Sequence, residues 1–425
     1  MSDQLNALRA FLDSAHSFYH STAYLSRELD EAGYTRLNES ADWDLKAGGK
    51  YYVNRGGSSI LAFRVPKAPV GYMVSATHID HPTFRLKVNG ELTGAYTRAC
   101  VERYGGMILS PWLDRPLSIA GQAMVDTDHG LETRLVDIDR DLALIPNVAI
   151  HMNRNINENT VLNMAVDMIP LVGGADGKGK LGKELEDAAG GKIMGADLYL
   201  YVRQRSSVWG LSNEFISAPG LDNLLCVWGC HRGFLNSCNS DSIPVMAIFD
   251  SEETGSNSRQ GADSTMLASL LARISRSLGL DHDRLLANSM LVSADMAHAL
   301  HPNHPEFADP AHAPVMNGGV VMKFNASKNY VTTGLSAALF RKVCAKAEVP
   351  LQIFHNRADI KGGSTLGYIS MNHVSIPSVD IGLAQLAMHS SYETAGVKDP
   401  FYLEQAMTTF FGCSLTTDGE TYVLN

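Results

Sequence analysis

The feature that most constrains this chain is a pair of adjacent glutamates, Glu252 and Glu253, that follows an apolar stretch. Residues 243–249 read Ile-Pro-Val-Met-Ala-Ile-Phe, a pattern typical of a buried strand. In open α/β folds, the carboxyl ends of such strands form the edge where active sites lie. Two carboxylates there are costly unless a positive group compensates them. A divalent metal ion would do so, and the alternative is a solvated acidic loop.

Two further apolar stretches end in polar residues of the same kind. Residues 70–77 form a predicted strand that leads to His78, with Asp80 two residues later. Residues 289–294 form another, which leads to Asp295. A carboxylate near a ligating histidine commonly fixes its orientation, so Asp80 is a candidate partner of His78. The alternative for His78 alone is a histidine held in the core by a hydrogen bond.

Asp222 and His389 complete the set. Asp222 precedes an apolar helical pattern over 224–235, where the alternative role for an aspartate is a helix N-cap. His389 follows the predicted strand 378–382 after a short connection. We therefore expect six side chains from five segments to meet at one edge of a sheet: His78, Asp222, Glu252, Glu253, Asp295 and His389.

Composition limits the class of protein. A chain of 425 residues favours two domains, and its net charge of -10 argues against nucleic acid or an anionic membrane as partners. Its apolar runs fall short of the ~18 residues that span a bilayer, and the first residues lack the pattern of a signal peptide. The six cysteines form no Cys-x-x-Cys pair. We expect a cytoplasmic protein with reduced thiols.

The patterns along the chain divide it into three parts. Residues 1–85 open with helical spacing over 3–32 and then read as strands. Residues 86–212 hold short β-like runs separated by turn residues, and 173–180 are predicted to form a flexible surface loop. Strands and helices alternate again over 213–425. The sequence predicts an α/β domain built from both ends of the chain, with an inserted, mostly β domain between them.

The residue types favour a particular kind of metal site. Histidines mixed with carboxylates suit Zn²⁺ or another first-row ion, whereas Ca²⁺ and Mg²⁺ prefer sites made of oxygen. Three carboxylates beyond one base exceed the needs of a single zinc ion, and they suit two metals about 3.5–4 Å apart with a bridging aspartate. The chain contains neither a His-Glu-x-x-His nor a Gly-x-Ser-x-Gly motif, which argues against two other hydrolase classes.

Seven stretches of the chain resemble, in order, the signature motifs of the M18 metallo-aminopeptidases, the aspartyl aminopeptidase family. They are residues 77–80 (THID), 150–157 (IHMNRNIN), 221–223 (LDN), 250–256 (DSEETGS), 293–298 (SADMAH), 363–367 (GSTLG) and 388–390 (MHS). The match spans most of the chain. One such motif alone would be weak, but seven in the family's order are specific.

The resemblance implies roles for the residues at the predicted site. Asp222 would bridge two divalent metal ions, most simply Zn²⁺, with Co²⁺ and Mn²⁺ as alternatives. Each ion would have two further ligands: His78 and Asp295 for one, Glu253 and His389 for the other. Glu252 would be the general base that takes a proton from the attacking water, and Asp80 would orient His78.

The resemblance also implies the architecture and the partners. The fold would be a zinc-exopeptidase-like α/β/α catalytic domain, formed by 1–85 and 213–425, with 86–212 as a dimerisation domain. Family members form large closed homo-oligomers, often dodecamers, so His151 would reach the site of a neighbouring subunit. The alternative for His151 is an ordinary surface or core histidine.

The expected substrates are peptides with an acidic N-terminal residue. Lys323 matches the family position associated with the acidic side chain, and His298, Gly363 and Ser364 are further candidate substrate contacts. Glycines at 362–363 leave backbone N–H groups free to bind an anion. One departure is the stretch 356–363, which is more basic than the family pattern. Alternative functions are a dizinc aminopeptidase of neutral specificity, another dizinc exopeptidase, or a non-catalytic assembly protein with a structural metal site.

Overall fold

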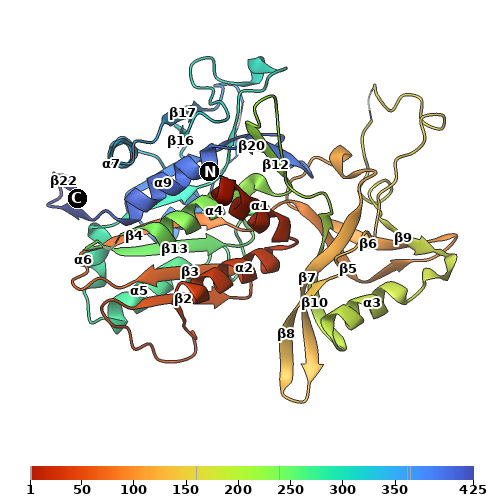
Figure 1. Cartoon of the computed structure of the whole chain (residues 1–425), viewed down its shortest axis with the longest axis horizontal. Helices are drawn as coiled ribbons and strands as arrows, with labels where there is room; N and C mark the ends of the chain where they lie inside the picture. The colour runs from red at the N-terminus through yellow and green to blue at the C-terminus, as the bar shows by residue number, and fades with distance from the viewer. Residues whose placement is uncertain (1, 159, 239, 361, 364) are drawn as a thin grey trace.

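The computed structural model describes residues 2–158, 160–238, 240–360, 362–363 and 365–425, except for the side chains of Ser2 and Tyr368. Figure 1 shows a larger unit, in which the red and blue ends of the chain pack together, and a smaller one built from the orange to yellow-green middle. No helix in the described part of the chain is long and apolar enough to cross a membrane.

A nine-stranded sheet forms the centre of the larger unit. In spatial order its strands are β1 (Thr35–Arg36), β2 (Lys50–Arg55), β3 (Ser59–Arg64), β13 (Ile243–Phe249), β4 (Tyr72–His78), β14 (Met290–Ala294), β18 (Ser378–Gly382), β16 (Val320–Phe324) and β17 (Leu351–His355). The four strands β13, β4, β14 and β18 are mutually parallel. Their carboxyl ends therefore meet at one edge, as the sequence predicts.

Helices cover both faces of this sheet, which explains why β13, β4, β14 and β18 are buried along their whole length rather than at alternate positions. One face packs on α1 (Ser2–Ser14), α2 (Phe18–Glu31), α4 (Leu221–Asn236), α7 (Gly334–Lys346) and α9 (Asp399–Phe411). The other packs on α5 (Met266–Ser277), α6 (His282–Ala287) and α8 (Leu366–His373). Along β13, Met246 and Ile248 point to the first face, and Val245 and Phe249 to the second. The α/β/α architecture expected from the sequence is confirmed.

The smaller unit is a six-stranded antiparallel sheet with one helix on it. Its spatial order is β8 (Gly130–Asp137), β7 (Leu117–Thr127), β10 (Ile193–Val202), β5 (Thr83–Leu92), β6 (Tyr96–Tyr104) and β9 (Leu171–Gly174). Helix α3 (Lys180–Ala189) supplies Leu181 and Leu185 to its core. This sheet has its own apolar cluster, which does not merge with the clusters of the larger unit.

The prediction of a flexible loop over 173–180 is wrong. Gly173 and Gly174 end β9 and pair with β6, residues 175–177 form a short 3-10 turn, and α3 begins at Lys180. A Cβ on Gly177 would lie 2.4 Å from Thr97 Oγ1. At least this glycine therefore permits a close approach to the neighbouring strand rather than marking a mobile segment.

A five-stranded sheet lies beside the carboxyl edge of the central sheet. Its order is β11 (Ser207–Trp209), β12 (Phe215–Ala218), β20 (Glu393–Gly396), β19 (Ala384–Leu386) and β15 (Ala297–His298). In this sheet β20, from the last part of the chain, pairs with β12, which follows the inserted sheet in sequence. A last pair, β21 (Leu415–Thr417) and β22 (Tyr422–Leu424), closes the chain.

Candidate metal centre

Three neighbouring strands deliver four of the predicted residues to one edge. His78 is the last residue of β4, and Asp295 directly follows β14. Glu252 and Glu253 form a 3-10 turn (Glu252–Thr254) that begins three residues after β13. Because β13 pairs with β4 and β4 with β14, residues far apart in sequence lie together.

The five-stranded sheet supplies the other two. Asp222 comes shortly after β12 at the start of α4, with non-helical backbone angles of φ -82° and ψ 104°. His389 follows β19 and has a φ of 66°. Both β12 and β19 pair with β20, so this small sheet places Asp222 and His389 on the same side of the centre.

Two groups of potential ligands share Asp222. His78, Asp222 and Asp295 offer ligand atoms within 4.8 Å of one another, and so do Asp222, Glu253 and His389. Asp222 Oδ1 lies 3.5 Å from His78 Nε2, while Asp222 Oδ2 lies 3.5 Å from His389 Nε2. The two oxygens of one carboxylate thus face different histidines, which is the arrangement a bridging ligand needs.

The residues fit a divalent metal ion in three respects. Asp222 Oδ1 and Glu253 Oε1 are buried and have no hydrogen-bond partner in the described part of the structure. Donor atoms around a tetrahedral zinc ion with bonds of about 2.0–2.1 Å stand about 3.3 Å apart. His389 Nε2 lies 3.3 Å from Glu253 Oε1, close to that separation. The mixture of imidazole and carboxylate donors suits a first-row ion.

An N-cap role for Asp222 is not supported, because no hydrogen bond within the described residues ties its carboxylate to the helix.

The electrostatics of the centre reflect a surplus of buried carboxylates. Burial raises the pKa of Glu253 to about 7 and that of Glu252 well above its usual range. Burial alone would lower the pKa of His389, but the adjoining carboxylates of Asp222 and Glu253 raise it to about 11. The pKa of His78 is likewise raised, against the effect of burial, by Asp222. A bound cation would relieve this crowding of negative charge.

Asp80 holds the glutamate pair in place. Its Oδ1 accepts a hydrogen bond from the Glu252 backbone N–H and its Oδ2 one from the Glu253 N–H, both at 3.1 Å. His78 Nδ1 lies 3.0 Å from the backbone oxygen of Asp80 and 3.6 Å from Oδ1. The backbone oxygen is therefore the nearer partner of the His78 ring, and the carboxylate serves the glutamates.

Sequence reasoning missed two residues that contact this set. Tyr104, the last residue of β6, donates its hydroxyl to Asp80 Oδ2 at 2.8 Å. Glu393 accepts hydrogen bonds from the backbone N–H groups of Asp222 and His389. Glu393 lies four residues after His389, and that spacing was its sole signal. Nothing in the sequence around Tyr104 points to Asp80.

The candidate substrate residues lie in different surroundings. Lys323 is buried, with Nζ 2.8 Å from the Met296 backbone oxygen and 3.8 Å from Asp295 Oδ1. His298 and Gly363 line a cleft of about 410 Å³. That cleft also includes Met388, the neighbour of His389, so it adjoins the metal centre.

The last two candidates are Ser364 and His151. Ser364 lies outside the described residues. His151 is exposed in the segment between β8 and β9 and belongs to none of the ligand groups found in the described residues of this chain.

Comparison with known proteins matches nearly the whole length of the chain. Residues 11–411 match a family model described as "Aminopeptidase I zinc metalloprotease (M18)". A probable M18 family aminopeptidase 2 of Clostridium novyi is 40% identical over 424 residues, which cover 96% of this chain and 98% of that protein. A structure of the Ape4 and Nbr1 complex matches with a TM-score of 0.93 and 33% identity, over 96% of this chain and 85% of that one. The S. cerevesiae mApe1 dodecamer matches with a TM-score of 0.85 and 26% identity, over 96% of both chains.

Proposed function

The chain belongs to the M18 family of zinc metalloproteases and is an aminopeptidase, and we propose that it uses two divalent metal ions to remove N-terminal Asp or Glu from peptides. The strongest support is the sharing of Asp222 by two ligand groups. One group is completed by His78 and Asp295, the other by Glu253 and His389. When bound, two ions would polarise the scissile carbonyl and stabilise the charge that develops on it.

Glu252 is the general base of this proposal. It belongs to neither group that contains Asp222, although it forms a further potential ligand group with His78 and Glu253. Because the two groups that share Asp222 already provide ligands for two ions, we assign the proton to Glu252. The hydrogen bond from the Glu252 backbone N–H to Asp80 fixes the position of the Glu252 backbone, from which the side chain extends. Glu252 would take a proton from the attacking water and return it to the leaving amine.

The acidic preference rests on local cations. The protein as a whole carries a net charge of -10, so long-range attraction would not favour Asp or Glu substrates. Lys323 is a buried cation 3.8 Å from Asp295, next to the centre. His298 and Arg357 line the adjoining cleft. Of these groups, Lys323 is the cation beside the centre, and its charge supports recognition of an acidic side chain at the substrate N-terminus.

We also propose that the protein assembles into a homo-oligomer, a dodecamer. Within it, residues 86–212 would form the contact between the two subunits of each dimer. The mApe1 relative is a dodecamer. The segment around His151 exposes apolar side chains, with exposed fractions of 52% for Ile150, 82% for Met152, 87% for Val161 and 69% for Val166. A monomer seldom leaves such a group uncovered, and a partner subunit would cover it and bring His151 to another site.

The experiment that tests this function combines metal analysis with a substrate panel. Metal content per chain is measured after exhaustive dialysis and again after loading with Zn²⁺, Co²⁺ or Mn²⁺. Aspartyl, glutamyl, alanyl and leucyl substrates are then compared with their N-blocked forms. Two ions per chain, with hydrolysis confined to free acidic N-termini, is the expected result. Preference for alanyl or leucyl substrates would indicate neutral specificity, and cleavage of N-blocked peptides would contradict the proposal.

A further inference from the structure

We propose that Glu393 is a positioning residue that holds Asp222 and His389 at a fixed separation, and so couples the two metal positions. The inference rests on the proposed two-metal function. Glu393 is not itself among the potential ligands found in the described residues. Glu393 would act through hydrogen bonds to the backbone of two potential ligands, Asp222 and His389.

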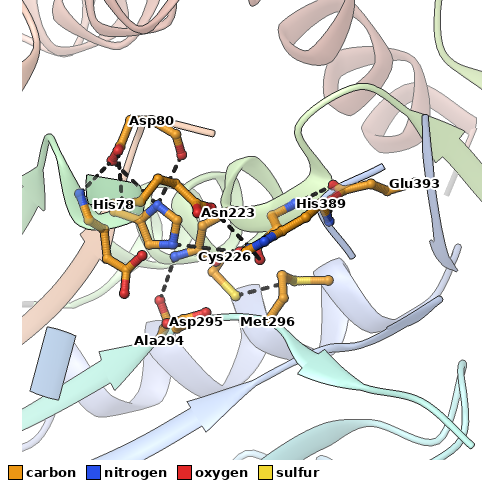
Figure 2. A network of polar contacts seen from close by, with 12 residues as sticks. His78, Asp80, Asn223, Cys226, Ala294, Asp295, Met296, His389 and Glu393 are labelled. Carbon is orange, nitrogen blue, oxygen red and sulfur yellow. Dashed lines mark hydrogen bonds and ion pairs between the residues drawn. The ribbon is translucent and has the colours of Figure 1, made fainter. Parts of the chain in front are cut away.

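The geometry of these contacts is specific. Glu393 is the first residue of β20 and is 1% exposed. Its Oε2 accepts a hydrogen bond from the Asp222 backbone N–H at 2.8 Å, and its Oε1 accepts one from the His389 N–H at 2.6 Å. Figure 2 shows the Glu393 side chain directed at His389 and the network around it. One carboxylate thus joins the start of α4 to the loop after β19.

The need for this support follows from where the two residues lie. His78 is fixed within β4, and the Asp295 N–H donates to the Ile381 backbone oxygen at 3.0 Å, as an extension of the sheet. Asp222 and His389 have no such ladder in the described structure, since Asp222 has non-helical backbone angles at the start of α4 and His389 lies in the loop after β19. Glu393 therefore replaces, for these two residues, the hydrogen bonds that a strand would supply.

Asp80 provides a parallel on the other side of the centre. Its two oxygens accept the backbone N–H groups of Glu252 and Glu253, which also lie outside the strands. Each of these two carboxylates thus accepts the backbone N–H groups of two functional residues. This repetition indicates a common way of fixing residues that the sheet edge cannot hold. Glu393 applies it to residues from both metal positions.

A carboxylate suits this task, and its amide does not. Both oxygens of Glu393 accept a backbone N–H group, so a donor on either oxygen would oppose its partner. Glutamine keeps the shape but turns one acceptor into an NH₂ group, which would face a backbone N–H. Glu393→Gln should therefore release either Asp222 or His389 while leaving the packing nearly unchanged.

The chain offers a matched control in Asp399. Its buried carboxylate accepts the backbone N–H groups of Asn317 at 2.6 Å and Gly319 at 3.0 Å, at the start of α9 and away from the metal ligands. Asp399→Asn thus removes the same kind of contact without touching the centre. Any loss common to both variants reports general destabilisation.

The experiment measures Zn²⁺ and Co²⁺ affinity by competition with a chromophoric chelator, together with metal stoichiometry and the Tm of the metal-free protein. We expect Glu393→Gln to bind at least one ion tenfold to hundredfold more weakly than the parent, as supporting contacts of metal ligands typically contribute. Asp399→Asn should lose Tm by a similar amount yet keep metal affinity within about threefold. The visible spectrum of the Co²⁺-loaded protein should change for Glu393→Gln and not for Asp399→Asn.

Equal metal affinity in the parent and Glu393→Gln would overturn the inference, and so would equal losses in both variants. If Glu393→Gln does not fold, Glu393→Asp replaces it, since it keeps the charge but cannot reach both N–H groups, and the same criteria apply. A parent protein that binds fewer than two ions would instead contradict the proposed function, so the two failures are distinguishable.

Discussion

Tyr104 donates its hydroxyl to Asp80 Oδ2 across 2.8 Å, and this contact joins the inserted β sheet to the metal centre. The segment that follows β6 continues along the centre. The Gly106 backbone oxygen lies 2.5 Å from His389 Nδ1, and the Ile108 N–H donates to the His389 backbone oxygen at 3.0 Å. The inserted sheet therefore contributes to the positions of the site residues within the same chain, in addition to any role in assembly.

Removing the Tyr104 hydroxyl should weaken catalysis without dissociating subunits. Asp80 would lose one hydrogen bond and hold Glu252 and Glu253 less firmly, so we expect Tyr104→Phe to reduce kcat tenfold to hundredfold. Tyr201→Phe is the control, because Tyr201 donates to Asp137 Oδ1 at 2.9 Å in the same sheet, away from the centre. Steady-state kinetics and sedimentation measure both effects. A Tyr104→Phe enzyme as active as Tyr201→Phe would show that the contact is dispensable.

The two adjacent glutamates should respond differently to the loss of charge. Glu252→Gln is expected to keep its metal content and lose turnover by ~10²–10⁴-fold, since it removes a general base. Glu253→Gln should lower metal occupancy as well, because Glu253 shares a ligand group with Asp222 and His389. Metal analysis beside kcat separates the two. If Glu252→Gln retained a rate within a few-fold of the parent, the base would have to be another residue.

Metal removal should lower stability more at higher pH. Burial raises the pKa of Glu253 to about 7, and the pKa of His389 is raised to about 11. In both cases the folded, metal-free protein binds more protons than the unfolded chain does, so this contribution to stability is lost as pH rises. For Glu253 the window runs from about pH 4.3 to about 7, and His389 continues the trend above about 6.5.

Thermal unfolding of chelated and Zn²⁺-loaded protein at pH 5, 6, 7 and 8 measures this effect. The Tm of the chelated protein should fall across the series, and the gap to the loaded protein should widen, because a bound cation compensates the carboxylates. A chelated protein that is more stable at pH 8 than at pH 5 would contradict the electrostatic account.

Much of the site could be predicted from sequence because its residues follow short apolar strands. His78, Asp295 and the glutamate pair each come after a stretch with a clear strand pattern, and parallel strands share an edge. The order of those strands could not be predicted from pattern alone. Strand β4 lies between β13 and β14, although it precedes both in the sequence. This spatial order depends on packing across the whole sheet.

Contacts made through the backbone had no sequence signal. The pairing of β12 with β20 joins residues 215–218 to 393–396, and this pairing positions both Asp222 and His389. Glu393 acts on backbone N–H groups, which nearly every residue carries, so the identity of its partners does not reveal the contact. Tyr104 contacts the Asp80 side chain from a strand of the inserted sheet, and no motif links these two residues. Gly177 in the segment 173–180 was misjudged because close approach to a strand and mobility both favour glycine.

His151 should act on the site of a neighbouring subunit. Its segment lies in the inserted unit, outside the metal centre of its own chain. Mixing His151→Ala chains with Glu252→Gln chains should restore part of the activity that each homo-oligomer lacks. In the mixture, some sites would combine the intact Glu252 of a His151→Ala chain with the intact His151 of a Glu252→Gln chain. Activity of the mixture is measured after dissociation and reassembly. A fully active His151→Ala homo-oligomer would return this histidine to an ordinary surface role.

Lys323 should set the preference for acidic residues. It is 2% exposed, its Nζ lies 2.8 Å from the Met296 backbone oxygen and 3.8 Å from Asp295 Oδ1, and Tyr330 lies beneath it with its ring centre 5.4 Å away. A buried ammonium beside the centre has donors left for a substrate carboxylate. A charge-assisted hydrogen bond of this kind contributes about 1.5–3 kcal/mol, or roughly a tenfold to hundredfold change in kcat/KM.

Lys323→Met is therefore compared with the parent on aspartyl, glutamyl, alanyl and leucyl substrates, and loss confined to the first two is expected. Arg357→Met is the control, since Arg357 lines the adjoining cleft but already pairs with Asp359 through two nitrogens at 2.7 Å. Equal loss on all four substrates would mean that Lys323 holds Asp295 in place and does not read the substrate. The acidic preference would then depend on Arg357 or on Lys361, and Lys361 lies outside the described residues. A selective loss on acidic substrates in Arg357→Met would identify Arg357 as the residue responsible.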